Sequence, residues 1–143
     1  MTTIERALDS DRTAIESLLA ASGLPLDGLE AAMAIAIVAR GSDGVVGCAA
    51  VEPYGSAGLL RSVCVAPDLR GAGLGRRLVA ATEELAAANG IAELYLLTET
   101  AETWFPMLGY VAATRAAVPA ALTTSAEFTG ACPDNAAVFR KRL

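Results

Sequence analysis

The sequence predicts a mixed α/β fold in a single domain over residues 1–143, and three observations support this prediction. Short runs of β-forming residues separated by turn residues fill the N-terminal half. The apolar run Leu59–Val65 then passes through a glycine-rich turn into an amphipathic helix at 74–89. Another strand follows that helix at Ile91–Thr98. Strand, helix and strand in this order form a right-handed βαβ unit whose two strands run parallel.

The N-terminal half is expected to form antiparallel strands around one helix. The predicted strands are Thr3–Ala7, Ala34–Arg40, Val45–Pro53 and Leu59–Val65. Asp9 or Ser10 can cap the helix, which stops near Gly23. The apolar face of that helix is formed by Ile15, Leu18 and Leu19. Pro25–Glu30 is a linker or a helical turn, and Gly41-Ser42-Asp43-Gly44 suits a hairpin turn between the second and third strands.

The C-terminal half contains the crossover helix and the last strands. In the helix at 74–89, apolar side chains recur three and four residues apart, at Leu74, Leu78, Ala81 and Leu85. Asn89-Gly90 ends this helix in the usual left-handed manner. Ala101–Leu108 is predicted as a short helix closed by Gly109. A long Ala/Thr segment then joins a last pair of strands, at Tyr110–Thr114 and Ala136–Arg142, so the predicted order is β-α-β-β-β-α-β-α-β-β.

Composition excludes several classes of protein. The net charge of −5 argues against nucleic acid as a partner. The chain has no histidine, the commonest metal ligand and general base, so we expect no metal. Three scattered cysteines form no CxxC pair, which favours a reducing compartment. No apolar run is long enough to span a bilayer and no signal peptide is apparent, so a cytoplasmic protein with no membrane partner is expected.

The most informative stretch is the turn from strand to helix, Arg70-Gly71-Ala72-Gly73-Leu74-Gly75-Arg76-Arg77. Glycine permits a positive φ and lets a ligand approach the backbone, and the first turn of a helix carries unpaired N–H groups and a partial positive charge. Together with three arginines, these features predict a phosphate cradle. Tight packing alone is the plain alternative. A nucleotide P-loop is disfavoured because no Lys and hydroxyl follow Gly75, and a dinucleotide fingerprint because the third glycine is missing.

Arg70-Gly71-Ala72-Gly73-Leu74-Gly75 resembles the acetyl-CoA signature of the GNAT N-acetyltransferase superfamily, Arg/Gln-x-x-Gly-x-Gly/Ala. The strand end Val63-x-Val65-x-Pro67 precedes it as in that family, and Leu94–Thr98 is similar to the strand that follows. Trp104-Phe105-Pro106-Met107-Leu108-Gly109-Tyr110 resembles the family's FYxxLGF segment, so the resemblance covers most of 45–115. The runs LLRSVCVAPDLRGAGLGRRLV, LYLLTETAETWF and AEFTGACP also resemble small N-acetyltransferases associated with arsenic-resistance operons.

This resemblance implies the GNAT acyl-CoA N-acyltransferase fold, in which the two central parallel strands splay apart and the pantetheine arm of acetyl-CoA lies in the gap. The backbone edge groups of Val63 and Val65 would bind that arm. The amides of Gly71, Gly73, Gly75 and Arg76 would bind the pyrophosphate. The full set expected to contact acetyl-CoA is Val63, Cys64, Val65, Arg70, Gly71, Ala72, Gly73, Leu74, Gly75, Arg76 and Phe105.

Acetyl transfer to an amine needs a polarised thioester carbonyl and a neutral amine. The backbone N–H of Val65 is the candidate oxyanion donor, because it lies where the strand opens. Glu99, Glu52 and Glu127 are the candidate general bases, although each fits the pattern of an ordinary solvated carboxylate better than that of a base. The family usually places a tyrosine at the position of Phe105, as the acid that protonates the thiolate. Phenylalanine cannot donate a proton, so Trp104 and Phe105 can also be core anchors.

Arg61 lies among apolar neighbours, where a charge is costly unless it has a partner. It is therefore either half of an internal ion pair or a clamp for an acceptor carboxylate. The residues expected to bind the acceptor are Arg61, Ser62, Thr98 and Glu127. The expected activity is acetyl-CoA-dependent N-acetylation of a small amino acid or amino-acid-like toxin. An acyl-CoA-binding module without turnover and a protein or peptide N-acetyltransferase are the alternatives, and a homodimer is left open.

Overall fold

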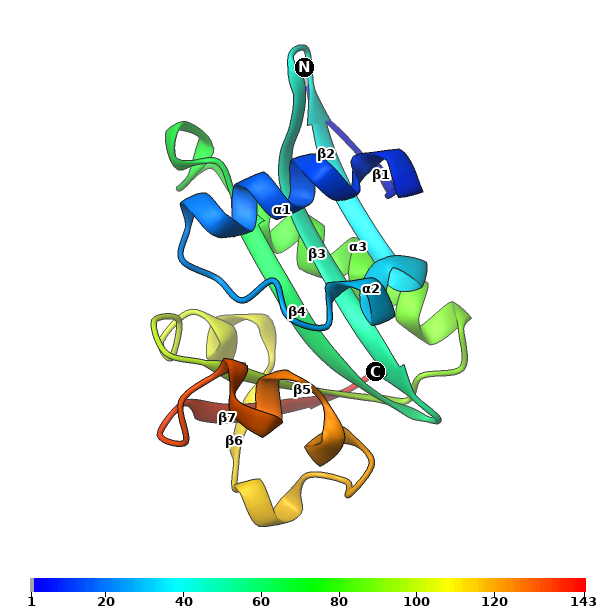
Figure 1. Ribbon diagram of the computed structural model, residues 1–143, viewed down its shortest axis with the longest axis vertical. Helices are drawn as coiled ribbons and strands as arrows, with labels where there is room; N and C mark the ends of the chain where they lie inside the picture. Colours follow the sequence, from blue (N-terminus) through cyan, green and yellow to red (C-terminus); the bar gives the residue numbers. More distant parts are fainter. Residues whose placement is uncertain (1) are drawn as a thin grey trace.

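The computed structural model describes residues 2–143 and has the predicted mixed α/β architecture, with one seven-stranded sheet in the order β1-β2-β3-β4-β5-β7-β6. The strands are β1 (Thr3–Arg6), β2 (Ala36–Gly41), β3 (Gly44–Tyr54), β4 (Ala57–Val65), β5 (Glu93–Thr98), β6 (Val111–Ala113) and β7 (Ala137–Arg142). The helices are α1 (Arg12–Ala21), α2 (Leu29–Ala32) and α3 (Leu74–Ala88). Figure 1 shows α1 and α2 on one face of the sheet and α3 on the other.

Strands β1 to β4 are antiparallel, as predicted. The hairpin between β2 and β3 has the predicted two-residue turn, Ser42-Asp43, between the paired glycines Gly41 and Gly44. The last two strands also pair antiparallel, with β7 inserted between β5 and β6. The observed strand bounds differ from the predicted ones by one or two residues at most ends, which is the usual uncertainty of a strand end.

Two helices bury apolar faces against opposite sides of the sheet. From α1, Ile15 and Leu19 are buried beside Val38 of β2, between the helix and the sheet. From α3, Leu78 is fully buried against the small side chains of β2 and β3, and Val79 packs in the larger core cluster around Phe105. The predicted periodicity identified Ile15 and Leu19 of α1 and Leu74 and Leu78 of α3 correctly. The predicted Ala81 and Leu85 are only partly buried, and the later buried residues of α3 are Val79, Thr82 and Ala86.

Two local predictions are wrong. Neither Asp9 nor Ser10 caps α1 through its side chain, because Asp9–Asp11 forms a separate 3-10 turn in which the carboxylate of Asp11 accepts the Leu8 N–H at 2.8 Å. The short helix expected at Ala101–Leu108 is only a 3-10 turn at Phe105–Leu108. Pro106 explains this difference, since it has no N–H with which to continue an α-helical ladder from the preceding turn.

Strands β4 and β5 are parallel but pair only where they begin, Ala57–Leu59 against Glu93–Tyr95. Beyond that point β4 continues to Val65 and β5 to Thr98, but the two strands no longer pair with each other. Figure 1 shows them running apart. Strand β5 remains paired with β7 along its whole length. The edge of β4 is therefore left bordering a gap, which is the predicted splay.

A β-bulge lies in the part of β4 that borders this gap. Between the register pairs Cys48–Cys64 and Ala50–Arg61, β4 advances three residues while β3 advances two, so β4 carries one extra residue. Ser62, inside the bulge, has a φ of +59° and is the one non-glycine residue with a positive φ within 2–143. A side chain is strained in that region of φ/ψ space, and such strain concentrates at functional sites.

Candidate functional site

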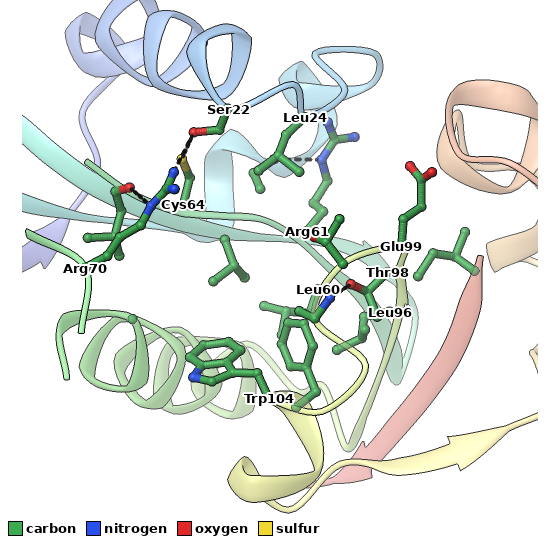
Figure 2. A pocket seen from close by; sticks show the side chains of 18 of the residues that line it. Ser22, Leu24, Leu60, Arg61, Cys64, Arg70, Leu96, Thr98, Glu99 and Trp104 are labelled. Carbon is green, nitrogen blue, oxygen red and sulfur yellow. Dashed lines mark hydrogen bonds between the residues drawn. The ribbon is translucent and has the colours of Figure 1, made fainter. Parts of the chain in front are cut away.

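A cavity of about 600 Å³ occupies the gap between β4 and β5. Its walls are β4 from Leu60 to Val65, the end of β5 with the turn that follows, the glycine loop, the segment Ser22–Pro25 after α1, and the tail residues Glu127 and Cys132. We call the part bounded by Arg70–Arg76 the glycine end. The part where Arg61, Thr98 and Glu99 meet the two tail residues is the tail end. Figure 2 shows Arg70 and Glu99 at opposite sides of this cavity.

The glycine end has the geometry that a phosphate cradle requires. Gly71 and Gly73 have φ values of +85° and +83°, and a Cβ added to either would meet no atom within 4 Å. The space in front of both residues is therefore open. Gly73 is also the N-cap of α3, so the N–H groups of the first turn have no partner inside the helix. Of the other loop residues expected to contact acetyl-CoA, Arg70, Leu74, Gly75 and Arg76 line the cavity and Ala72 does not.

Gly75 was expected only to contact acetyl-CoA, but it also has a packing role. A Cβ there would lie 3.2 Å from the indole ring of Trp104, so glycine lets α3 pack against that ring. Trp104 in turn meets Phe105 edge-on, with ring centroids 4.9 Å apart. Phe105 is only 6% exposed and also lines the cavity. It is therefore both a core anchor and part of the wall, and its ring has no proton to donate.

Arg70 links the glycine loop to two other elements. Its Nε donates to the carbonyl oxygen of Val65 at 3.1 Å, and its Nη2 donates to the Ser22 hydroxyl at 3.2 Å. The oxygen of Ser22 lies 3.1 Å from the sulfur of Cys64. These contacts join the end of α1, the end of β4 and the loop, so Arg70 holds the glycine end in place in addition to contributing positive charge.

The backbone of β4 presents polar groups to the gap. The N–H of Ala66 donates to the carbonyl of Val46 on the β3 side at 2.8 Å. Because successive strand residues direct their backbone groups to opposite edges, Val65, next to Ala66, directs its own towards the gap. The N–H of Val65 thus lies on the edge where an oxyanion donor is needed. Its catalytic role stays a prediction.

At the tail end, Arg61 is completely enclosed, with a side-chain exposure of 0%. Its guanidinium donates to the Glu52 carboxylate at 2.8 Å, the Asp27 carbonyl at 2.5 Å, the Pro25 carbonyl at 3.3 Å and the Ser62 hydroxyl at 3.1 Å. Its Nε also lies 3.6 Å from the Glu127 carboxylate. Of the two interpretations of Arg61, the structure has the internal ion pair, and Figure 2 shows the side chain extending past Leu24.

The three candidate bases occupy different positions. Glu52 is buried and accepts bonds from Arg61 and from the Tyr54 hydroxyl at 2.9 Å, but it does not line the cavity. Glu99 lines the cavity and is exposed. Glu127 both lines the cavity and is buried, with a side-chain exposure of 6%. Glu127 is therefore the candidate that combines access to the cavity with shielding from water.

Burial raises the pKa of Glu127 to about 7, and the nearby Arg61 guanidinium opposes that rise while Glu52 adds to it. A carboxylate with this pKa exchanges a proton readily near neutral pH. Burial and the neighbouring Glu127 carboxylate also raise the pKa of the Cys132 thiol to about 12, so that thiol stays protonated. Thr98 also lines the cavity, and its hydroxyl accepts the Ala101 N–H at 3.0 Å.

The sequence analysis missed one wall of the cavity. The segment Ser22–Pro25 contributes two carbonyl or hydroxyl partners for the site's arginines, Pro25 to Arg61 and Ser22 to Arg70. No local motif marks this segment, because it reaches the site only when α1 packs across the sheet. The tail around Glu127, which the sequence places near the acceptor by resemblance, does line the cavity.

Within residues 2–143, no cluster of three or more His, Cys, Asp or Glu side chains has an arrangement that would hold a metal ion. None of the helices in the same range is long and apolar enough to cross a membrane. The three cysteines are free.

The chain belongs to the GNAT acetyltransferases, because the model of the Acetyltransferase (GNAT) domain matches residues 33–112, more than half of its length. An amino-acid acetyltransferase from Ralstonia nicotianae is 44% identical over 75 residues, which are 50% of this chain and 17% of that protein. The chain therefore spans less than a fifth of that relative's length.

Solved structures show the same fold. An N-acetylglutamate synthase from Neisseria gonorrhoeae, solved with coenzyme A and N-acetyl-glutamate, has a TM-score of 0.84 at 24% identity, covering 100% of this chain and 35% of that one. The Mycobacterium tuberculosis protein Rv2747, solved with CoA, has a TM-score of 0.79 at 23% identity, covering 99% of both chains. A GNAT acetyltransferase from Staphylococcus aureus has a TM-score of 0.80 at 13% identity.

Proposed function

We propose that this chain is an acetyl-CoA-dependent N-acetyltransferase that acts on a small primary amine. The observation that carries the proposal is that one cavity joins the open glycine end, the unpaired edge of β4 and the buried carboxylate of Glu127. Such an enzyme must bind the phosphates, polarise the thioester carbonyl and remove a proton from the amine. A candidate group for each of these tasks borders the same cavity.

The residues present fit acetyl-CoA. Gly71 and Gly73 leave open space where a side chain would stand, and the first turn of α3 offers N–H groups and a positive dipole end to phosphates. Arg76 adds a full positive charge at the same end. The β4 edge at Val63 and Val65 can pair with the amides of the pantetheine arm in place of a neighbouring strand. Acetyl-CoA supplies the acetyl group as a thioester.

Glu127 is the proposed general base. It takes one proton from the acceptor's ammonium, and the neutral nitrogen then forms a bond to the thioester carbonyl carbon. The N–H of Val65 stabilises the negative charge that develops on the carbonyl oxygen. When the C–S bond breaks, sulfur leaves with the bonding electron pair and receives the second amine proton. The products are the amide and the free thiol, and Glu127 returns its proton to solvent.

Phe105 is compatible with this chemistry although it cannot act as an acid. A thiol has a pKa near 8.5, about one unit above the working pH, so departure without prior protonation costs only about 1.4 kcal/mol. A side chain that lowers this barrier is therefore a refinement and not a requirement.

An amino acid or amino-acid-like toxin is the finer expectation for the acceptor. The name of the Ralstonia relative and the resemblance to the arsenic-associated subgroup support it. The enclosed Arg61 removes one of its supports, because that guanidinium presents no exposed surface to a carboxylate. Small primary amines as a class, with free amino acids included, are therefore the compounds to test.

A thiol-release assay with acetyl-CoA and a panel of amino acids, amino-acid amides and simple amines tests the proposal. Amine-dependent release, with the acetylated product identified by mass spectrometry, is the expected result. Coenzyme A binding by calorimetry without release for any amine would instead identify a binding module. Acetylation of peptides but of no free small amine would identify a peptide N-acetyltransferase.

A further inference from the structure

The tail end of the cavity contains a positive charge that an acceptor cannot use. All four groups hydrogen-bonded to the Arg61 guanidinium belong to the protein, and the side chain has 0% exposure. Two carboxylates, Glu52 and Glu127, lie against this single guanidinium, so the cluster carries no surplus positive charge in either protonation state of Glu127.

The other charges around the cavity are segregated. Among the lining residues of the described chain, the remaining arginines, Arg70 and Arg76, belong to the glycine end, and Arg70 is bonded to Val65 and Ser22. The tail end adds a further exposed carboxylate, Glu99. Figure 2 shows Arg70 and Glu99 on opposite sides. An acceptor carboxylate at the tail end would therefore meet two carboxylates and no accessible cation.

Neutral hydrogen-bonding groups are present at the same place. The Ser62 hydroxyl accepts from Arg61, and the Thr98 hydroxyl accepts from the Ala101 N–H, so each retains its own proton for donation. Both residues line the cavity. A hydroxyl donor suits a carbonyl or carboxamide oxygen, whereas a carboxylate placed in a partly buried site without a cation keeps most of its desolvation penalty.

From this arrangement we infer that the acceptor is a primary amine without a free carboxylate, such as an amino-acid amide or a simple or cationic amine, and that free α-amino acids are poor acceptors. This inference rests on the proposed acetyl transfer but goes against the amino-acid acceptor that the relative's name favours. The glycine end attracts the anionic partner, and the tail end attracts the cationic one.

The test compares acceptors that differ only in the carboxylate: phenylalanine, phenylalaninamide and phenethylamine, with the same three-member series built on alanine and methionine. The amide and the decarboxylated amine should exceed the acid in kcat/KM by about tenfold or more in at least one series. Phenethylamine is essential to the design, because its amine is at least as basic as that of phenylalanine. A preference for it cannot then arise from a larger neutral fraction.

Two charge variants sharpen the test. Glu99→Lys places a cation at the tail end and should raise kcat/KM for the acid. The ratio of kcat/KM for the amide to kcat/KM for the acid should then fall by about fivefold or more. Glu102→Lys makes the same change three residues away, on an exposed residue that does not line the cavity, and should leave the ratio as it is. Calorimetric titration of each acceptor into the protein saturated with coenzyme A gives a readout that does not depend on turnover.

The outcomes separate the inference from the proposed function. Acetylation of amines with equal or better use of the free acids would overturn the inference and leave the acetyltransferase proposal intact. Coenzyme A binding with no thiol release would overturn the proposed function. In that case tighter binding of the acid than of the amide to the coenzyme A complex would overturn the inference as well, and so would the absence of any acceptor binding.

Discussion

The two ends of the cavity are built in opposite ways. The glycine end consists of seven consecutive residues, Arg70–Arg76, most of them exposed, with open space before Gly71 and Gly73. The tail end is assembled from β4, the end of β5 with Glu99, and the tail, and two of its charged groups, Arg61 and Glu127, are enclosed in contact with each other and next to Glu52. The glycine end is therefore open to the charges of a ligand, whereas the buried charges of the tail end are paired within the protein.

This difference predicts different failures on mutation. A change at Gly71 or Gly73 should alter binding and leave the fold intact, because no atom lies within 4 Å of a Cβ added at either residue. A change at the tail end should alter either stability or proton transfer, because a buried charge cluster loses its balance when one member is removed.

The largest effect on stability should come from Arg61→Ala. Without the guanidinium, Glu52 and Glu127 remain buried near each other with no counter-charge, and the free energy of unfolding should fall by about 3–5 kcal/mol. Urea denaturation measures this. The control is Arg142→Ala, whose pair with Glu93 spans 4.0 Å and whose side chain is 86% exposed, and it should cost less than about 1 kcal/mol. If Arg61→Ala is stable and its KM for the acceptor is raised, the interpretation of Arg61 as a clamp for an acceptor carboxylate would be favoured instead.

The next effect concerns coenzyme A affinity. Gly73→Asp introduces a carboxylate into the cradle and should weaken coenzyme A binding about ten- to hundredfold in calorimetry, the loss of roughly one or two charge-assisted contacts. Gly73→Asn has nearly the same shape without the charge and should weaken binding less.

Gly90→Asp is the matched control for the backbone. Gly90 has the same φ, +83°, also has no atom within 4 Å of an added Cβ, and follows the other end of α3. Its substitution should cost similar stability and leave coenzyme A affinity unchanged. Equal affinity losses at the two positions would show that α3 stability, and not a phosphate cradle, explains the effect.

The smallest effect is expected from Phe105→Tyr. A phenol could supply the proton that the leaving thiolate otherwise takes from the amine, a gain of at most about tenfold in kcat, which corresponds to about 1.4 kcal/mol. Phe139→Tyr adds a hydroxyl at a residue with the same 6% exposure that does not line the cavity, and it should change kcat little. A wild-type protein that is inactive while Phe105→Tyr turns over briskly would favour the binding-module alternative.

The same contrast explains how much could be predicted from the sequence. The fold and the glycine end follow from local patterns, since strand, glycine turn and amphipathic helix are neighbours in the chain. The splay was predicted from family resemblance and is confirmed by the short pairing of β4 and β5. The packing of Gly75 against Trp104 could not be predicted, because the two residues are 29 positions apart in the chain and no spacing rule connects them.

The tail end depends on contacts that are even more distant in sequence. Whether Arg61 is paired or available depends on the Pro25 and Asp27 carbonyls, on Glu52 and on Glu127. The sequence alone therefore left both interpretations open. It also proposed three bases without ranking them, because the feature that separates Glu127 from Glu52 and Glu99 is burial at the cavity wall.

The most direct test of the division between the two ends is the pH dependence of kcat/KM for wild type and Glu127→Gln. Burial raises the pKa of Glu127 to about 7, so the wild-type value should fall about tenfold per pH unit below that pH, as the carboxylate takes up a proton. This limb should stay in place when acceptors of different basicity are used. In Glu127→Gln it should vanish, with kcat lowered about 100-fold or more and coenzyme A affinity unchanged. An unchanged limb and near-normal kcat in Glu127→Gln would contradict the account.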